Sequence, residues 1–222
     1  MAESRVLPVF PLPDVVFFPK TVLPLHVFEM RYRSMVRDAL AADRTIAVAL
    51  LQPGWERDYA HAPAYFPVAT AGRMDDVETT ADGRFYFRLS GLCRVRLGEV
   101  VRDSPYRLVR ASEIPERTVD DADAGIHHAK LDLIASQVCL VRELTGREHP
   151  AIVLDEGISF EAAVNGACAG LPTEPAARQA LLELDDLLER QRRAAAILDE
   201  ILGRVLRLKA MRSRDEGESG PN

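Results

Sequence analysis

The sequence is poor in several features that mark well-known classes of protein. Its three cysteines, Cys93, Cys139 and Cys168, lie far apart without a CxxC pair, so we expect neither a disulfide framework nor a zinc knuckle. No apolar run approaches the roughly 18–20 residues of a membrane helix. The N-terminus lacks the charged-then-apolar pattern of a secretory signal. We therefore expect free thiols in a reducing compartment and a cytoplasmic location.

Signatures of common cofactor and catalytic sites are also missing. The sequence contains no GxxxxGK[ST], no GxGxxG after a strand, no GxSxG and no HExxH. The adjacent His127 and His128 would point about 100° apart on a helix, which makes them a poor chelating pair. We predict no cofactor, no metal site and an exposed helix face for these two histidines.

Charge divides the chain into two unlike halves. The net charge is −6, and residues 1–117 carry 16 basic and 15 acidic groups whereas residues 118–222 carry 12 and 19. Neither half is the basic platform that nucleic-acid-binding domains present. We assign a β domain to residues 5–117, a helical bundle to residues 118–212 and a flexible tail to residues 213–222.

The first half is typical of short strands interrupted by proline. Four prolines between residues 11 and 24 exclude a helix there. Asp82-Gly83 indicates a hairpin, and Gly91 indicates another turn. Strand-like segments are residues 5–10, 45–51, 65–77, 84–90, 93–102 and 106–113. With one amphipathic helix over residues 29–41, the pattern predicts an α+β protein that begins with a small antiparallel β pseudobarrel.

The apolar spacing of the second half is helical. We expect one helix over residues 124–145, preceded by aspartates and ended by Gly146. Ser159 is a candidate cap for a second helix, a third begins near Thr173, and Asp186 resembles the start of a capping box. One helix or two could cover residues 174–210. The residues expected to be buried in the last helix are Leu198, Ile201 and Val205.

Aromatic residues and arginines supply the candidate binding groups of the first half. Aromatic side chains in loops can line an apolar groove for extended peptides, and the candidates are Trp55, Tyr59, Tyr65 and Phe66. We expect Phe17, Phe18 and Phe28 to lie in the core. Arginines gather in the last strands, where they could face an acidic partner, RNA or solvent, and we favour a solvated outer face of the sheet. These arginines are Arg84, Arg88, Arg94, Arg96, Arg107 and Arg110.

A catalytic cysteine is the third class of hypothesis. Arg94 follows Cys93 and could lower its thiol pKa. Neighbouring residues of a strand point to opposite faces, however, and no histidine is near in the sequence. The thiol is therefore expected to be inert.

Several motifs resemble one known family. Five segments are similar to the N-terminal substrate-binding domain of Lon proteases. They are residues 7–19 (LPVFPLPDVVFFP), 23–29 (LPLHVFE), 31–36 (RYRSMV), 89–95 (LSGLCRV) and Pro105-Tyr106. The resemblance covers about residues 5–115, and a weaker likeness around Gln179 extends it into the helices. It implies a six-stranded pseudobarrel joined to a helical bundle. It also implies recognition of exposed or unfolded protein segments, or docking to a protein partner.

The leading hypothesis is a non-catalytic binding module, because the chain has no motif for the ATPase or Ser–Lys protease modules of full-length Lon. We predict a cleft between the β domain and the helices, with the four loop aromatics as contacts and Arg31 and Arg33 at its edge. Expected partners are polypeptide clients or a protein such as a Lon-type protease, and a homodimer is also considered. No membrane partner is expected. The alternatives are an RNA-binding β barrel and an uncharacterised hydrolase.

Overall fold

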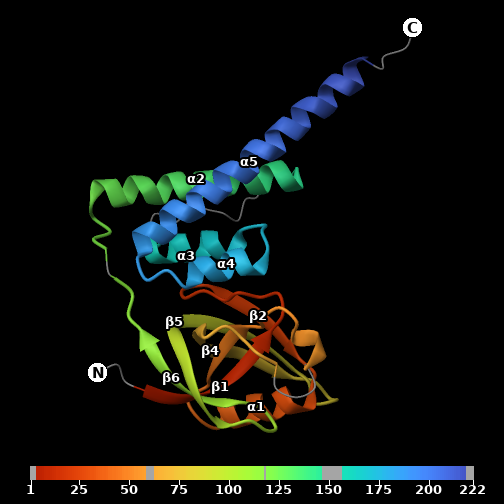
Figure 1. Ribbon diagram of the computed structural model, residues 1–222, viewed down its shortest axis with the longest axis vertical. Coiled ribbons are helices and arrows are strands. Elements are labelled where there is room, and N and C mark those ends of the chain that lie inside the picture. The colour runs from red at the N-terminus through yellow and green to blue at the C-terminus, as the bar shows by residue number, and fades with distance from the viewer. Residues whose placement is uncertain (1–3, 59–62, 118, 147–156, 219–222) are drawn as a thin grey trace.

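A computed structural model describes residues 4–58, 63–117, 119–146 and 157–218, with side chains described to residue 211. A six-stranded sheet is curled into a pseudobarrel, and a group of helices stands over one end of it (Figure 1). The first half contains β1 (Ser4–Leu12), β2 (Val22–Val27), α1 (Met30–Leu40), β3 (Thr45–Leu50), a 3₁₀ turn (Trp55–Arg57), β4 (Val68–Thr79), β5 (Phe85–Arg102) and β6 (Leu108–Ile114). The second half contains α2 (Ala124–Thr145), α3 (Phe160–Gly170), α4 (Pro175–Leu182) and α5 (Leu187–Glu218).

The sheet has the strand order β2-β5-β4-β3-β1-β6, and a further pairing of β5 with β6 closes the pseudobarrel. Only β1 and β3 run parallel among the described strand pairs. The α+β class and the pseudobarrel expected from the sequence are confirmed. β5 holds this arrangement together because its 18 residues pair in turn with β2, β4 and β6.

Gly91 corrects the sequence interpretation of this region. We expected a turn there between two strands, but Gly91 lies within the continuous strand β5. A Cβ atom at this position would collide with the carbonyl oxygen of Phe18. The Gly91 N–H also donates to the Thr21 carbonyl at 2.9 Å. Glycine is needed here for the close approach of another backbone segment and not for a change of chain direction.

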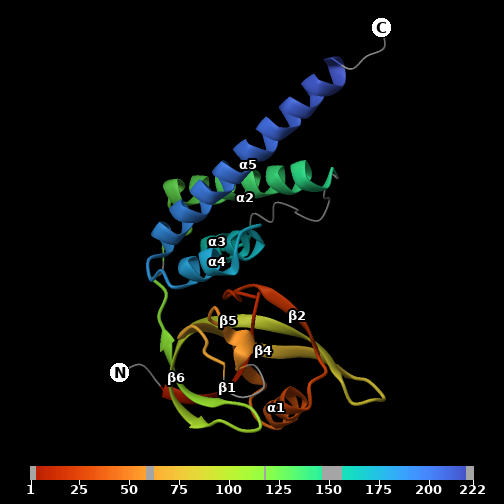
Figure 2. The same ribbon diagram turned by 45° about the vertical axis from the view of Figure 1, so that its right-hand side comes forward.

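Alternating residues of the strands fill two separate cores. Small and branched side chains face the inside of the pseudobarrel, among them Val9, Ala47, Ala69 and Val109. The opposite faces of β1 and β3 pack against α1, which lies at the end of the pseudobarrel away from the other helices (Figure 2). All six residues of β3 are buried because both of its faces are covered.

Local signals place the helices of the second half as expected. The Asp123 side chain caps α2 by accepting from the Gly125 and Ile126 N–H groups, and Gly146 ends that helix with φ 65°. Ser159 caps α3 in the same way. Asp186 accepts from the Leu188 and Glu189 N–H groups at 2.9 and 3.1 Å, so residues 174–210 form two helices.

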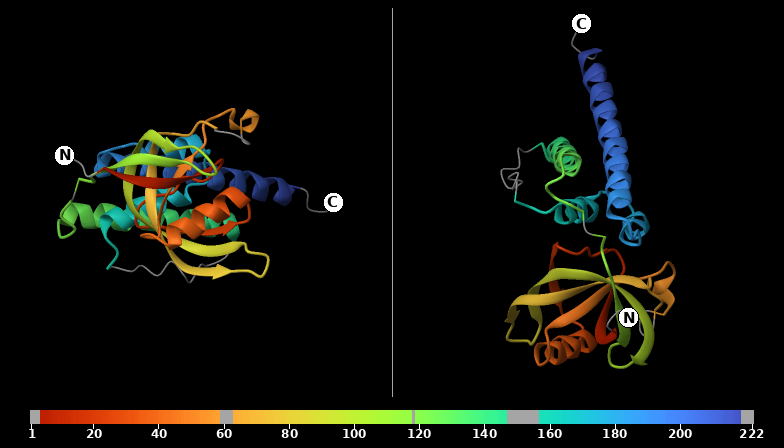
Figure 3. Two further views of the ribbon diagram at one scale, coloured as in Figure 1. Left: turned by 90° about the horizontal axis from the view of Figure 1, so that it is seen from below. Right: turned by 90° about the vertical axis from the view of Figure 1, so that its left-hand side faces the viewer.

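Burial in the last helix follows the expected stripe only in part. Leu198 is 1% exposed, whereas Ile201 and Val205 are partly buried. The helix continues to Glu218, past Ser213 where the sequence predicted a polar tail. Its C-terminal part projects beyond the other helices (Figure 3). The described buried residues of α5, which are Leu187, Arg190, Ala194 and Leu198, all lie within its first twelve residues.

The two halves share a third core. Phe18, Leu50 and Val68 from the β half pack with Phe160, Leu181 and other residues of the helices. Phe17 and Phe18 are buried as expected, but the expectation for Phe28 was wrong because its side chain is 58% exposed. Phe28 lies just beyond the edge strand β2, where no further element covers it within the described part of the chain.

Two arginines are fully buried at the junction of the halves. Arg94 on β5 and Arg190 on α5 are each 0% exposed, and both bind the carboxylate of Glu116. The structure therefore corrects the expectation that Arg94 belongs to a solvated outer face. Arg94 does point outward from the pseudobarrel, but the helices cover it. Arg96, two residues along β5, is exposed.

The same two arginines satisfy carbonyl groups at the end of α4. Arg94 donates to Leu182 at 3.1 Å, and Arg190 donates to Leu181 at 3.1 Å and to Leu184 at 2.6 Å. The last carbonyls of a helix have no partner within it and carry partial negative charge. Burial lowers the pKa of Arg190, while the nearby Glu116 carboxylate opposes that shift. The junction is thus held by charge and hydrogen bonds together.

We predict that Glu116→Gln destabilises the protein by about 3–5 kcal/mol, because it removes the carboxylate that pairs with buried Arg190 and leaves buried Arg94 with only the exposed Asp185 as its counter-charge. Urea unfolding followed by circular dichroism measures this. Glu189→Gln is the matched control, since Glu189 pairs with Arg192 and Arg193 on the exposed side of α5 and should change the midpoint little. Equal effects of the two substitutions would contradict the prediction.

Candidate functional site

An apolar groove lies between the β half and the start of α4. Its volume is about 190 Å³. The β half contributes one wall and α4 the other. The lining residues are Pro13, Leu50, Leu51, Pro53, Trp55, Phe66, Glu174, Pro175 and Ala176. Proline has no backbone N–H and presents a ring surface, so its three occurrences here leave the groove with few hydrogen-bonding groups.

Main-chain contacts hold the aromatic wall of the groove in place. Gly54 adopts φ 88°, a left-handed conformation that turns the chain into the 3₁₀ segment carrying Trp55. The Phe66 N–H donates to the Leu50 carbonyl at 2.8 Å, and the Gln52 side chain donates to the Tyr65 carbonyl at 3.1 Å. These two hydrogen bonds hold the ends of the loop that carries Trp55 close to each other.

The structure brings together two of the four predicted aromatic contacts. Trp55 and Phe66 both line the groove. Tyr65 does not, because adjacent residues in extended backbone face opposite sides, and its ring lies 5.1 Å below the Arg107 guanidinium. Burial raises the pKa of Tyr65, while Arg107 opposes this. Tyr59 lies outside the described residues.

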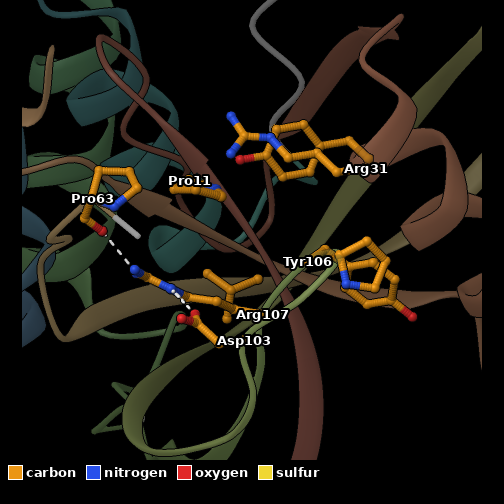
Figure 4. Close-up of a pocket in the computed structure, with 9 residues that line it drawn as sticks. Pro11, Arg31, Pro63, Asp103, Tyr106 and Arg107 are labelled. Atoms are coloured by element: carbon orange, nitrogen blue, oxygen red, sulfur yellow. Dashed lines mark hydrogen bonds and ion pairs between the residues drawn. The ribbon is translucent and has the colours of Figure 1, made fainter. Parts of the chain in front are cut away.

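Arg31 lies beside a different and much smaller cavity. Its guanidinium pairs with Glu29 and stacks on the Tyr32 ring at 4.6 Å. Figure 4 shows Arg31 and Arg107 on this cavity, where Arg107 donates to the Pro63 carbonyl at 2.7 Å and to Asp103 at 2.8 Å. The cavity volume is about 20 Å³, which holds about one water molecule. Arg31 therefore does not edge the groove.

Arg33 serves the hairpin between β4 and β5. Its Nη2 donates to the Asp82 carbonyl at 2.9 Å. Gly83, with φ 76°, leaves room for the guanidinium where a Cβ atom would stand. Neither predicted arginine contacts the groove, and the second wall comes from Pro175 and Ala176, which sequence reasoning missed. Pro175 at the first turn of α4 marks a helix start, but no local pattern shows that this helix start faces Trp55.

The remaining arginines of the last strands are mostly paired with acids. Arg88 pairs with Asp76, Arg84 with Asp82 and Arg110 with Glu99. Such pairing reduces the positive potential that a phosphate backbone would meet. The arrangement gives no support to an RNA-binding face on β5 and β6.

The family model for the ATP-dependent protease La (LON) substrate-binding domain matches residues 6–200. The chain belongs to this family. The match spans the pseudobarrel, α2, α3, α4 and the first turns of α5, so it includes both walls of the groove.

Curated relatives of this Lon-domain chain are longer proteins. Lon protease 2 of Myxococcus xanthus is 28% identical over 208 residues, which cover 88% of this chain and 24% of that protein. Lon protease of Anaeromyxobacter dehalogenans is 31% identical over 134 residues, covering 60% of this chain and 16% of that protein. The chain thus spans about a quarter or less of these two relatives.

Solved structures of Lon N-terminal domains share the fold. The N-terminal domain of the Mycobacterium avium complex Lon protease aligns with a TM-score of 0.66 and 18% identity, covering 88% of this chain and 98% of that one. The Lon N-terminal domain protein from Xanthomonas campestris aligns with a TM-score of 0.63 and 25% identity, covering 86% and 98%. The resemblance drawn from the sequence motifs is confirmed.

Metal-binding clusters, membrane-spanning helices and reactive thiols are the remaining features that could indicate another activity. Among residues 4–58, 63–117, 119–146 and 157–218, no three His, Cys, Asp or Glu side chains are grouped to hold a metal ion. In the same residues, no helix is both long and apolar enough to cross a membrane. Burial raises the pKa of Cys93, and the Glu113 carboxylate adds to this shift. Burial raises the pKa of Cys168 to about 12.

We predict that both thiols react slowly with iodoacetamide at pH 8. A raised pKa leaves less thiolate at that pH, so the Cys93 rate should increase as pH rises, and Cys168 should react only after unfolding. Mass spectrometry of the alkylated protein measures each site. The same protein in urea is the control, in which all three cysteines should react. Faster alkylation of Cys93 in the folded protein than in urea would contradict the predicted slow reaction and would support the hypothesis of a nucleophilic cysteine.

Proposed function

We propose that this chain binds exposed apolar segments of other polypeptides without catalysing a reaction on them. Membership of the Lon substrate-binding domain family supports the class of ligand. The groove between the β half and α4 carries the proposal of where binding occurs. Its proline and aromatic walls favour apolar side chains of an extended peptide.

The size of the groove supports a side chain as its occupant. Pockets for small molecules usually enclose about 300–1,000 Å³, and this groove has about 190 Å³. That space suits one or two side chains of a polypeptide whose main chain stays outside. Glu174 at the rim would favour a neutral or basic residue beside the apolar anchor.

The partners proposed for this chain follow from what the relatives contain. The aligned region is 24% of the Myxococcus protease, so the catalytic activity of that protein is not assigned to this chain. We propose that the chain supplies recognition, and that a Lon-type protease is the first protein partner to test. Three free cysteines fit action in the reducing cytoplasm.

Trp55 is the only tryptophan of the chain, and its fluorescence reports directly on the groove. We expect reduced, carboxymethylated ribonuclease A, which is an unfolded polypeptide without tryptophan, to shift Trp55 emission in a saturable titration. Native ribonuclease A should give no shift. If neither fluorescence nor calorimetry detects binding of the unfolded polypeptide, the proposed function is contradicted.

Adjacent residues provide matched variants for the groove. Phe66→Ala should weaken binding about tenfold, because one buried aromatic contact is worth about 1–2 kcal/mol at an interface. Tyr65→Ala should leave the affinity within about twofold because its ring faces Arg107. Thermal unfolding of both variants checks that they are folded. If the Phe66 variant binds like the wild type, the ligand occupies another surface.

A further inference from the structure

A second surface, distinct from the groove, lies along the edge of the sheet. Among the described strands, β2 pairs only with β5, so its other side ends the sheet. Figure 2 shows β2 on the outer flank of the pseudobarrel. An edge strand presents main-chain donors and acceptors at regular spacing, and an added strand can satisfy them.

The hydrogen bonds to β5 show which residues of β2 face outward. Thr21 accepts from the Gly91 N–H at 2.9 Å, so Thr21 turns its polar groups toward β5. In an antiparallel strand, every second residue directs its N–H and C=O groups toward the same neighbour. Leu23 and Leu25 therefore face β5 like Thr21, whereas the main-chain groups of Val22, Pro24 and His26 face away from β5. Pro24 fits this assignment because its missing N–H would otherwise be needed by β5.

Exposed apolar side chains lie beside this edge. Val22 and Phe28 are each 58% exposed, Met30 is 65% exposed and Tyr86 on β5 is 45% exposed. The His26 ring stacks on Tyr86 with centroids 4.2 Å apart and an angle of 3° between planes. The Phe28 ring lies 5.7 Å from His26. A row of rings therefore borders the outer edge of β2.

We propose that the β2 edge binds an extended segment of another polypeptide as an added strand. Only an extended main chain matches the alternating donors and acceptors of Val22 and His26. Apolar or aromatic residues at alternate positions of that segment would rest on the rings of His26, Tyr86 and Phe28. The proposal takes its class of ligand from the proposed function but shares no residue with the groove.

Charge and proline argue against other occupants of the edge. Arg88 beside Pro24 is paired with Asp76, so this arginine offers no unpaired charge to an ionic ligand. Pairing with the β2 edge of a second copy would place Pro24 on both strands and lose a donor from each. An added strand from another polypeptide would lose only the one N–H donor that Pro24 lacks.

Two substitutions with opposite expected effects test strand addition. Val22→Pro removes an outward N–H while keeping an apolar side chain, and Pro24→Val supplies the donor that the native edge lacks. The probe is a fluorescein-labelled dodecapeptide of alternating phenylalanine and threonine with lysine at each end. Because one main-chain hydrogen bond is worth about 1 kcal/mol, Val22→Pro should weaken binding about fivefold and Pro24→Val should tighten it by about the same factor. Fluorescence anisotropy measures both.

The same peptide with N-methyl groups on alternate residues is the ligand control, and it should bind at least tenfold more weakly. Phe28→Ala should also weaken binding, and the two β2 substitutions should keep their effects in the Phe66→Ala background, which removes an aromatic contact of the groove. Unchanged affinity in both β2 variants, or equal binding of the N-methylated peptide, would overturn strand addition. If Val22→Pro fails to fold, the gain expected for Pro24→Val still decides the matter.

Failure of this proposal is separable from failure of the proposed function. The Val22→Pro variant should still show the Trp55 emission shift with carboxymethylated ribonuclease A. If the emission shift is retained but neither β2 substitution changes the affinity for the peptide, the groove proposal stands and the edge proposal is wrong. If the wild-type protein binds neither polypeptide, both proposals are wrong.

Discussion

The carboxylate of Glu116 determines how the two halves of this protein meet. It lies between the guanidinium groups of Arg94 and Arg190, both fully buried. An unpaired charge in such surroundings costs several kcal/mol, so the helices can move little relative to the sheet without a large penalty. The arginines also satisfy the carbonyls at the end of α4. One ionic cluster thus fixes the position of a helix and of the wall that this helix gives to the groove.

The two surfaces of the molecule have different physical characters. The groove is bordered by proline and aromatic rings and depends on the placement of α4 against the sheet. The β2 edge offers main-chain hydrogen bonds with a row of rings beside it and depends only on the pseudobarrel. In the two proposals made above, the groove receives a side chain and the β2 edge receives an extended backbone.

Signals carried by a few neighbouring residues predicted much of the fold. Asp123, Ser159 and Asp186 each begin a helix where their capping groups indicated, because a cap is satisfied by backbone within three residues. Gly91 was misinterpreted since its role depends on Phe18, far away in the sequence. The candidate site was predicted in part: Trp55 and Phe66 share the groove, whereas Arg31 and Arg33 serve other contacts.

The sequence by itself determined the strand-rich first half, the helical second half, the family and the absence of common catalytic motifs. These properties depend on local spacing, capping and composition. Only the tertiary structure decided that Arg94 is buried, that Phe28 is exposed and that Pro175 faces Trp55. Each of these depends on which distant element covers a given face of a strand or helix. Periodicity shows that a residue faces outward from its own element, but the packing of other elements decides whether that direction leads to solvent.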